Sequence, residues 1–414
     1  MGAVGLAMNE AATLTDKFGR TPECLAIVDM ARKLAPLVRE LAPESERLRT
    51  LAPELVDAFV ESRLFGITVP HVLGGLEVDA ITLFEVIEIL SAADGSAGWV
   101  MAVSAGSGGA TLALFDPEVA REMVGEDVNV SLSAASGVAI GRAVPIGDGK
   151  YKVSGRWPFL SGCVHSKWLG GSVILLDEEG NRRIHPEHGP EMRTCYFRNA
   201  PDLIIDNWDP MGMRGTGSHD VEISDLVIPE SHMVNPFRAP SRLEGALWRI
   251  PWFSIQVICL AAVPLGIARG VIDRFIELAP AKRRSTVGGM GPALSEDPWV
   301  QAELAKAEAS VQAARAYVLD AIAGMWQTAT LGDAITLDQR VRLRLAARHA
   351  MEASVQAIDG LFQLAGARAT FSADPLQRAM RDIHTLTQHI TYSVDVWAKH
   401  SRHVFGIEQP TLDI

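Results

Sequence analysis

Apolar residues recur at steps of three and four positions through most of the chain, which places them on one face of a helix. In the N-terminal part this pattern predicts helices over 21–38, 53–63, 80–93 and 117–123. In the C-terminal part it predicts longer helices over 253–278, 298–331, 338–367 and 375–405. Four long helices in succession favour an antiparallel bundle.

The middle of the chain has a different pattern. Segments 150–156 and 220–228 alternate apolar and polar residues or are rich in β-branched residues, and clusters of Gly, Pro, Asp and Asn lie between them. This pattern predicts a small antiparallel β-barrel or sandwich. We therefore expect a mainly α fold with a β insert (α+β): an N-terminal helical domain over 1–127, a central β-domain over 128–236 and a C-terminal four-helix bundle over 237–414.

Composition narrows the class of protein. The chain has 414 residues, 48% of them hydrophobic, so it can bury a large core, and its net charge of −12 disfavours nucleic acid and anionic membranes as partners. Its four cysteines are scattered without zinc-type spacing, which favours reduced thiols. The first residues lack the features of a signal peptide. The longest apolar run, 252–268, contains Ser254, Gln256 and Pro264, so we expect a buried helix there and a soluble cytoplasmic protein.

The stretch 375–390 combines an apolar stripe with a polar face. Asp374 followed by Pro375 is a helix-start signal, and the helix beyond it presents Arg381, His384 and His389. A solvated or internally paired polar face is one interpretation. In particular, we expect Arg381 and Asp382 to form an ion pair at the helix surface or a subunit contact.

Three further segments carry distinctive short patterns: 69–76 (VPHVLGGL), 156–163 (RWPFLSGC) and 209–218 (DPMGMRGTGS). With 375–390, in this order, they resemble the acyl-CoA dehydrogenase superfamily. They are most similar to its oxygen-using branch, the two-component flavin-dependent monooxygenases that hydroxylate phenols and related compounds. The resemblance covers the chain from about 29 to about 406.

Ser161 lies in a turn punctuated by Pro and Gly after a predicted strand, where it could be an ordinary turn serine. The resemblance instead implies that its hydroxyl lies near flavin N5, with Phe159 against the flavin ring. A donor at N5 should slow the loss of peroxide from a C4a-hydroperoxyflavin. By the same resemblance Trp157 and Ser133 are assigned to cofactor binding, and Ser136 to the border of the substrate site.

His389 is the second catalytic candidate. In medium-chain acyl-CoA dehydrogenases a glutamate beyond the Arg-Asp pair removes the substrate α-proton, and the matching residue here is Ile390, which cannot accept a proton. Related monooxygenases place a histidine at the adjacent position, close to the flavin and the substrate. An imidazole there could act as a base toward a phenol or assist oxygen activation. The alternative is a satisfied core histidine.

The remaining candidates come from the same resemblance. Arg283 and Arg284 fall where many members hold flavin phosphates, often across a subunit interface, and the alternative is a solvated basic helix end. His71 precedes a Gly-Gly turn and is assigned to the substrate pocket. His185 and His188 look like part of a polar hairpin loop, so we expect no metal site.

The leading hypothesis is a flavin-dependent monooxygenase that takes reduced FMN or FAD from a separate flavin reductase and uses molecular oxygen to hydroxylate an aromatic or electron-rich small molecule. N-hydroxylation of an amine, as in nitrososynthases, is a variant. An acyl-CoA dehydrogenase with bound FAD is the main alternative, and it would need a replacement base such as Glu244, Asp273 or Glu277. A superfamily member that binds flavin or ligand without turnover is a third. The family expectation is a homotetramer.

Overall fold

The four helices predicted in the N-terminal part begin at or within one residue of the predicted positions, and two further short helices lie in a segment for which no helix bounds were predicted. The computed structural model describes residues 16, 18–128, 132–135, 141–187, 189–286, 289–411 and 414. Thr21 caps the first helix by accepting the N–H of Cys24, and Asp79 caps the third by accepting those of Ile81 and Thr82. The helices are α1 (Pro22–Leu48), α2 (Pro53–Glu61), α3 (Ala80–Ala93), α4 (Gly95–Val100), α5 (Gly108–Thr111) and α6 (Pro117–Val124). A π-helical segment, η3 (Met101–Ser107), joins α4 to α5.

The central part is a mixed sheet, so the prediction of an antiparallel arrangement is wrong for two of its strands. Strands β1 and β2 both run parallel to β4, and the strand order is β10-β7-β4-β2-β3-β9-β8 with β1 beside β4. Among the described residues no ladder joins β10 to β8, so closure into a barrel is not seen. The strands are β1 (Leu132–Ala135), β2 (Gly141–Pro145), β3 (Lys150–Leu160), β4 (Trp168–Leu175), β7 (Met192–Arg198), β8 (Ile204–Ile205), β9 (His219–Pro229) and β10 (Met233–Val234).

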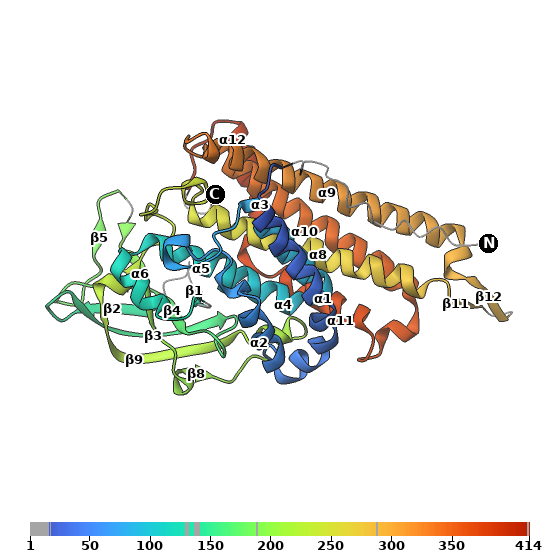
Figure 1. Ribbon diagram of the computed structural model, residues 1–414, viewed down its shortest axis with the longest axis horizontal. Helices are drawn as coiled ribbons and strands as arrows, with labels where there is room; N and C mark the ends of the chain where they lie inside the picture. The colour runs from blue at the N-terminus through green and yellow to red at the C-terminus, as the bar shows by residue number, and fades with distance from the viewer. Residues whose placement is uncertain are drawn as a thin grey trace.

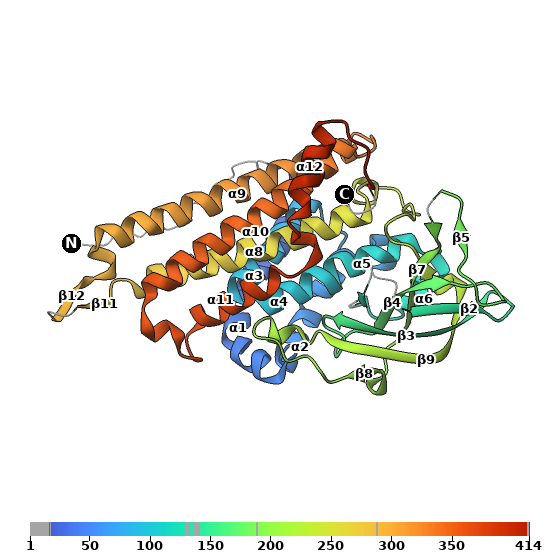
Figure 2. The same cartoon turned by 180° about the vertical axis from the view of Figure 1, so that it is seen from behind.

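The C-terminal part contains the long helices that the pattern predicts, except that the fourth is interrupted. Its elements are α8 (Trp252–Leu278), α9 (Pro298–Thr330), α10 (Leu337–Ala365), α11 (Pro375–Leu386), the 3₁₀ turn η10 (Ile390–Tyr392) and α12 (Asp395–Val404). The hydroxyls of Thr385 and Thr387 bond back to carbonyls of α11, and His389 Nδ1 accepts the N–H of Thr391. These local bonds compete with helix continuation, and Figure 2 shows α12 at a steep angle to α10.

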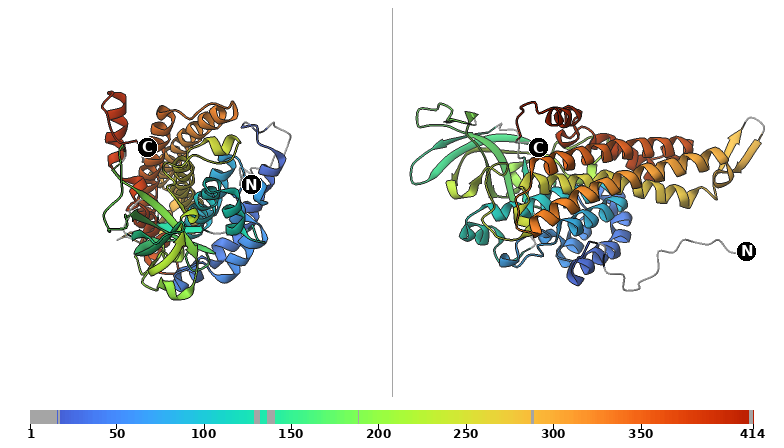
Figure 3. Two further views of the ribbon diagram at one scale, coloured as in Figure 1. Left: turned by 90° about the vertical axis from the view of Figure 1, so that its left-hand side faces the viewer. Right: turned by 90° about the horizontal axis from the view of Figure 1, so that it is seen from above.

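The helices of both ends of the chain share one hydrophobic core. Helix α8 packs against α3 and α10, and α10 also packs against α9, while a second core fills the sheet. The segments 95–114 and 252–278 are long and apolar enough to span a membrane, but 94% and 83% of their most apolar windows are buried within the fold. The sheet lies at one end of the molecule, and the hairpin of β11 (Arg283–Thr286) and β12 (Gly289–Ala293) extends from the other (Figures 1 and 3).

Candidate active site

A bulge at the end of β3 shapes the turn that carries Ser161. The pairing of β3 with β9 shifts register between Trp157 and Leu160, and Phe159 takes a left-handed φ of +66°. Gly162 follows at φ +75°, and its N–H donates to the carbonyl of Thr216 at 2.7 Å. The bulge exposes the ring of Phe159 and turns Ser161 toward α4.

The hydroxyl of Ser161 belongs to a directed chain of hydrogen bonds. Trp99 Nε1–H donates to Ser161 Oγ at 2.9 Å, Ser161 Oγ pairs with Ser218 Oγ at 2.7 Å, and Ser218 Oγ pairs with Thr216 Oγ1 at 2.6 Å. Thr216 Oγ1 donates its only proton to the carbonyl of Met213 at 2.7 Å. Thr216 therefore accepts from Ser218, and Ser218 accepts from Ser161.

This order leaves Ser161 Oγ with an unused lone pair and no unused proton. The expectation that Ser161 donates to a cofactor therefore changes, because in this arrangement its hydroxyl can only accept a further hydrogen bond. The backbone carbonyl of Ser161 is also fixed, by the hydroxyls of Ser133 at 2.8 Å and Ser104 at 3.4 Å. Ser133, predicted to contact the cofactor, is buried and supports the Ser161 turn.

The π-helical segment brings Ser104 to this turn. The hydroxyl of Thr68 bonds to this segment, donating to the carbonyls of Ala105 and Gly106 at 2.7 Å. Trp99 lies one turn earlier on α4, and its indole is 7% exposed. The sequence pattern indicated only close packing by small residues around Trp99.

His389 contacts the same indole. The ring centroids of Trp99 and His389 are 5.0 Å apart in an edge-to-face contact. Burial of the ring, with a smaller effect from the Arg344 guanidinium, lowers the pKa of His389 to about 4. His389 Nδ1 accepts the N–H of Thr391 at 3.3 Å, so the neutral ring carries its proton on Nε2. In this state His389 offers a hydrogen-bond donor rather than a base.

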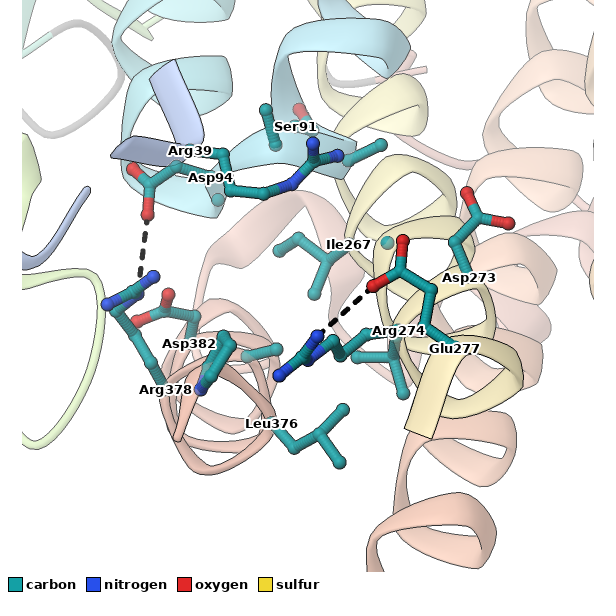
Figure 4. Close-up of a pocket in the computed structure, with 17 residues that line it drawn as sticks. Arg39, Ser91, Asp94, Ile267, Asp273, Arg274, Glu277, Leu376, Arg378 and Asp382 are labelled. Carbon is teal, nitrogen blue, oxygen red and sulfur yellow. Dashed lines mark hydrogen bonds and ion pairs between the residues drawn. The ribbon is translucent and has the colours of Figure 1, made fainter. Parts of the chain in front are cut away.

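The structure disfavours the acyl-CoA dehydrogenase alternative. The side chain of Ile390, at the position of the dehydrogenase base, is 73% exposed. Two of the suggested replacement bases lie on α8, where Asp273 pairs with Arg269 at 2.7 Å and Glu277 with Arg274 at 3.1 Å. Figure 4 shows both carboxylates around a separate pocket, and no described contact joins either to Ser161 or His389.

The two aromatic residues assigned to the cofactor differ in accessibility. The Phe159 ring is 68% exposed and meets the Trp208 ring edge-to-face at 6.0 Å. A flat, exposed aromatic face next to a fixed hydroxyl acceptor fits the ring system of a reduced flavin, which is apolar on its faces and carries N–H groups at its edge. Trp157 is fully buried in the sheet core and donates to the carbonyl of Ser172. In this conformation it has no surface toward a cofactor, so we assign it a structural role.

Other predicted residues are not brought to this cluster by any described contact. His71 is exposed and its ring bonds to the carbonyl of Leu76. Arg283 bonds to the carbonyl of Gly291 within the β11–β12 hairpin, far along the bundle from the sheet (Figure 1). The side chain of Arg284 and all of Ser136 and His188 lie outside the described residues. Within the described part of the chain no three His, Cys, Asp or Glu side chains gather as metal ligands.

Comparisons with known proteins identify the family of the chain. Residues 21–124 match the model of the acyl-CoA dehydrogenase N-terminal domain, and residues 258–394 that of the C-terminal domain. The chain is 31% identical over 389 residues to indole-3-acetate monooxygenase of Pseudomonas putida, with 94% of each chain covered. It is 29% identical to the flavin-dependent monooxygenase oxygenase subunit HsaA of Rhodococcus jostii, with 86% and 92% covered. The structure of XiaF from Streptomyces, solved with FADH2 and glycerol, has a TM-score of 0.84 and 26% identity over 93% of this chain and 96% of that one.

Helices around a mixed sheet, together with the matches to both domain models, thus define a protein of the acyl-CoA dehydrogenase fold. Within that fold the chain belongs to the two-component flavin-dependent monooxygenases, as an oxygenase subunit. Such a subunit uses reduced flavin, which implies a flavin reductase as its partner.

Proposed function

We propose that this oxygenase inserts one atom of molecular oxygen into an aromatic or other electron-rich small molecule, through a C4a-hydroperoxyflavin formed from diffusible FMNH2 or FADH2. The observation that supports this proposal is the contact of Trp99 with both Ser161 and His389. One indole thereby fixes the position of a hydroxyl acceptor relative to a neutral imidazole donor. The proposed substrate class is supported by the relatives, which include an indole-3-acetate monooxygenase and a resorcinol hydroxylase.

Ser161 would hold a proton in place. Reduced flavins carry a hydrogen on N5, and the free lone pair of Ser161 Oγ can accept that N–H. Premature release of hydrogen peroxide requires loss of this hydrogen, so an acceptor that holds it without removing it favours productive oxygen transfer. A serine hydroxyl is a very weak base, and its own proton is already donated to Ser218.

His389 would supply a hydrogen-bond donor from a half-buried position. Its Nε2–H can bond to an oxygen atom of oxygen-derived groups or of the substrate, which favours the assisting role over the base role among the sequence-based expectations. Arg344 stabilises the turn behind it by donating to the carbonyl of Thr391 at 2.9 Å. Tyr392 anchors the same turn by donating to the carbonyl of Leu260 on α8 at 2.6 Å.

The assembly we propose is a cytoplasmic homotetramer. The β11–β12 hairpin carries Arg283 to the end of the molecule opposite the sheet (Figure 2), where it could reach flavin only in a neighbouring subunit. Several large apolar side chains after α11 are exposed on the single chain: Ile390, Val394, Val404, Phe405 and Ile407. Size-exclusion chromatography with light scattering gives the mass directly, and a monomer at micromolar concentration would contradict this assembly.

The direct test of the reaction uses labelled oxygen. The protein would be mixed with chemically reduced FMN or FAD, ¹⁸O₂ and a panel of indoles and phenols, and the products analysed by mass spectrometry. The proposal predicts a product with one ¹⁸O atom that is absent when the protein is omitted. Incorporation of oxygen from H₂¹⁸O instead, or acyl-CoA-dependent bleaching of a resident flavin, would contradict it.

A further inference from the structure

Two buried carboxylates meet on the far side of the Ser161 cluster. Asp94 and Asp382 line a pocket of about 140 Å³ between α3, α8 and α11, and Figure 4 shows Arg378 beside both. Arg378 Nε lies 3.6 Å from Asp94 Oδ1, and Arg378 Nη1 lies 3.9 Å from Glu46 Oε2. Asp382 is 3% exposed, so the prediction of a surface ion pair or subunit contact for this residue is wrong.

Asp382 holds the turn that precedes β9. Its Oδ1 accepts the N–H of Met213 at 2.5 Å. The neighbouring Arg381 donates to the carbonyl of Met211, so adjacent residues of α11 fix both ends of the turn. Between them Gly212 lies so close to α11 that a Cβ atom would come within 2.2 Å of the Arg381 carbonyl oxygen. Met213 itself has a left-handed φ of +55°, which a non-glycine residue keeps only when its surroundings impose it.

The same Met213 ends the hydroxyl chain of the active site. Its carbonyl accepts from Thr216 Oγ1 at 2.7 Å and from Trp208 Nε1 at 3.1 Å. A carboxylate on its N–H and three donors on its carbonyl, the third being the Thr216 N–H at 3.2 Å, determine how this residue is oriented. Through Thr216 and Ser218, that orientation decides where the proton of Ser161 points.

Asp94 positions the helix that carries Trp99. Its Oδ2 accepts the N–H of Ala97 at 2.9 Å and so caps α4, the helix that carries Trp99. Gly95 lets α4 pack closely on α8, since a Cβ there would lie 2.9 Å from Ile267 Cδ1, and the Asp382 carboxylate lies next to the same position. The carboxylate pair therefore supports both groups that bond to Ser161 Oγ: Trp99 through α4 and Ser218 through Met213.

We propose that Asp382 is a positioning residue for the oxygenase reaction, which keeps Ser161 Oγ an acceptor by fixing Met213 at the end of the Thr216–Ser218–Ser161 chain. This inference rests on the proposed function for its catalytic consequence, but the chain itself exists without flavin. Burial of a carboxylate costs free energy of folding. An apolar residue at position 382 would pack α11 equally well, but it would leave the Met213 N–H without an acceptor.

The first test needs no flavin. Protein labelled with 5-fluorotryptophan gives ¹⁹F signals for its nine tryptophans, and Trp99→Phe and Trp208→Phe identify two of them. Asp382→Ala is expected to shift or broaden the Trp99 and Trp208 signals and leave the rest unchanged. Asp382→Asn keeps an oxygen acceptor for Met213 and should resemble the wild type. The matched control is Asp359→Ala, which removes from α10 a half-buried carboxylate that pairs with His384 of α11.

The second test measures hydrogen peroxide released per reduced flavin oxidised, in a double-mutant cycle with Ser161→Ala. Asp382→Ala alone should raise peroxide release relative to product, with the peroxide-forming rate up about tenfold. In the Ser161→Ala background it should add little, because the residue through which it acts is gone. Asp382→Asn should restore coupling.

Three outcomes would overturn the proposal: unchanged Trp99 and Trp208 signals in Asp382→Ala, additive effects of the Asp382 and Ser161 substitutions, or no rescue by Asp382→Asn. If Asp382→Ala fails to fold, Thr216→Val interrupts the chain without touching the carboxylates and is expected to give the same Trp99 shift and the same non-additivity. Suppose that Asp382→Ala changes the Trp99 and Trp208 signals as predicted but the wild-type protein forms no hydroxylated product. That result would refute the proposed function and leave the positioning role of Asp382 intact.

Discussion

Substitution of Ser161 by alanine tests the hydroxyl chain at its catalytic end. The change removes the acceptor of Trp99 Nε1–H, which is buried, and the donor to Ser218. An unsatisfied buried N–H costs about 1–3 kcal/mol, so we expect a folded protein of lower thermal stability. Loss of one hydrogen bond at flavin N5, of about 1.4–3 kcal/mol, corresponds to peroxide loss that is about 10–100 times faster.

The assay mixes the reduced flavin–enzyme complex with oxygenated buffer and quantifies both hydrogen peroxide and hydroxylated product. Ser161→Thr keeps the hydroxyl and is the control, expected to retain most of the coupling. Ser218→Ala removes the group that accepts the Ser161 proton, and it should increase peroxide release because Ser161 can then turn its proton toward the flavin. Wild-type coupling in Ser161→Ala would refute the role assigned to this hydroxyl.

Three further predictions concern charge and exposure. The pKa of His389 is about 4 in the folded protein and about 6.5 when unfolded, so the folded state binds fewer protons than the unfolded state between these two pH values. The free energy of unfolding should therefore fall as pH drops through this range. His389→Gln should flatten this part of a profile of melting temperature against pH. Burial and the nearby Asp94 raise the pKa of Asp382 to about 7, so the folded state binds more protons than the unfolded state. The free energy of unfolding should therefore fall as pH rises from about 4 to about 7. Asp382→Asn should remove this pH dependence when unfolding is measured by chemical denaturation. Phe159→Ala should weaken binding of reduced flavin about 3–10-fold in an anaerobic fluorescence titration with little change in melting temperature, whereas Trp157→Ala should cost about 3–5 kcal/mol of stability; equal loss of stability in both would contradict their different exposure.

The helices were predictable because each has a strong local signal. Pro22, Pro53 and Pro117 stand in the first turn of predicted helices, where a missing N–H costs little and depends only on local sequence. The interruption after α11 was not predictable in the same way, because it arises from side-chain bonds of Thr385, Thr387 and His389 that compete weakly with the helix. The parallel pairing of β1 and β2 with β4 likewise depends on long-range contacts that no local pattern encodes.

The candidate site was also predictable from the sequence only in part. Ser161 and His389 were found because the resemblance points to their positions, and the structure brings them to one indole. That connecting indole, Trp99, was missed because its segment is dominated by small residues. The burial of Asp382 was missed because its surroundings come from α4 and the 209–218 turn, which are distant in sequence. The available signal was the GMRGTGS string itself, whose Thr216 and Ser218 form the hydroxyl chain.

The account's central claim is that this cluster holds an oxygenated reduced flavin long enough for transfer to a substrate. Stopped-flow absorbance after mixing the anaerobic protein–FMNH2 or protein–FADH2 complex with oxygenated buffer tests it most directly. The account predicts a transient near-ultraviolet band, distinct from oxidised flavin, that decays slowly in the wild type and faster in Ser161→Ala. Direct appearance of oxidised flavin, with no transient and at the same rate in both proteins, would contradict it.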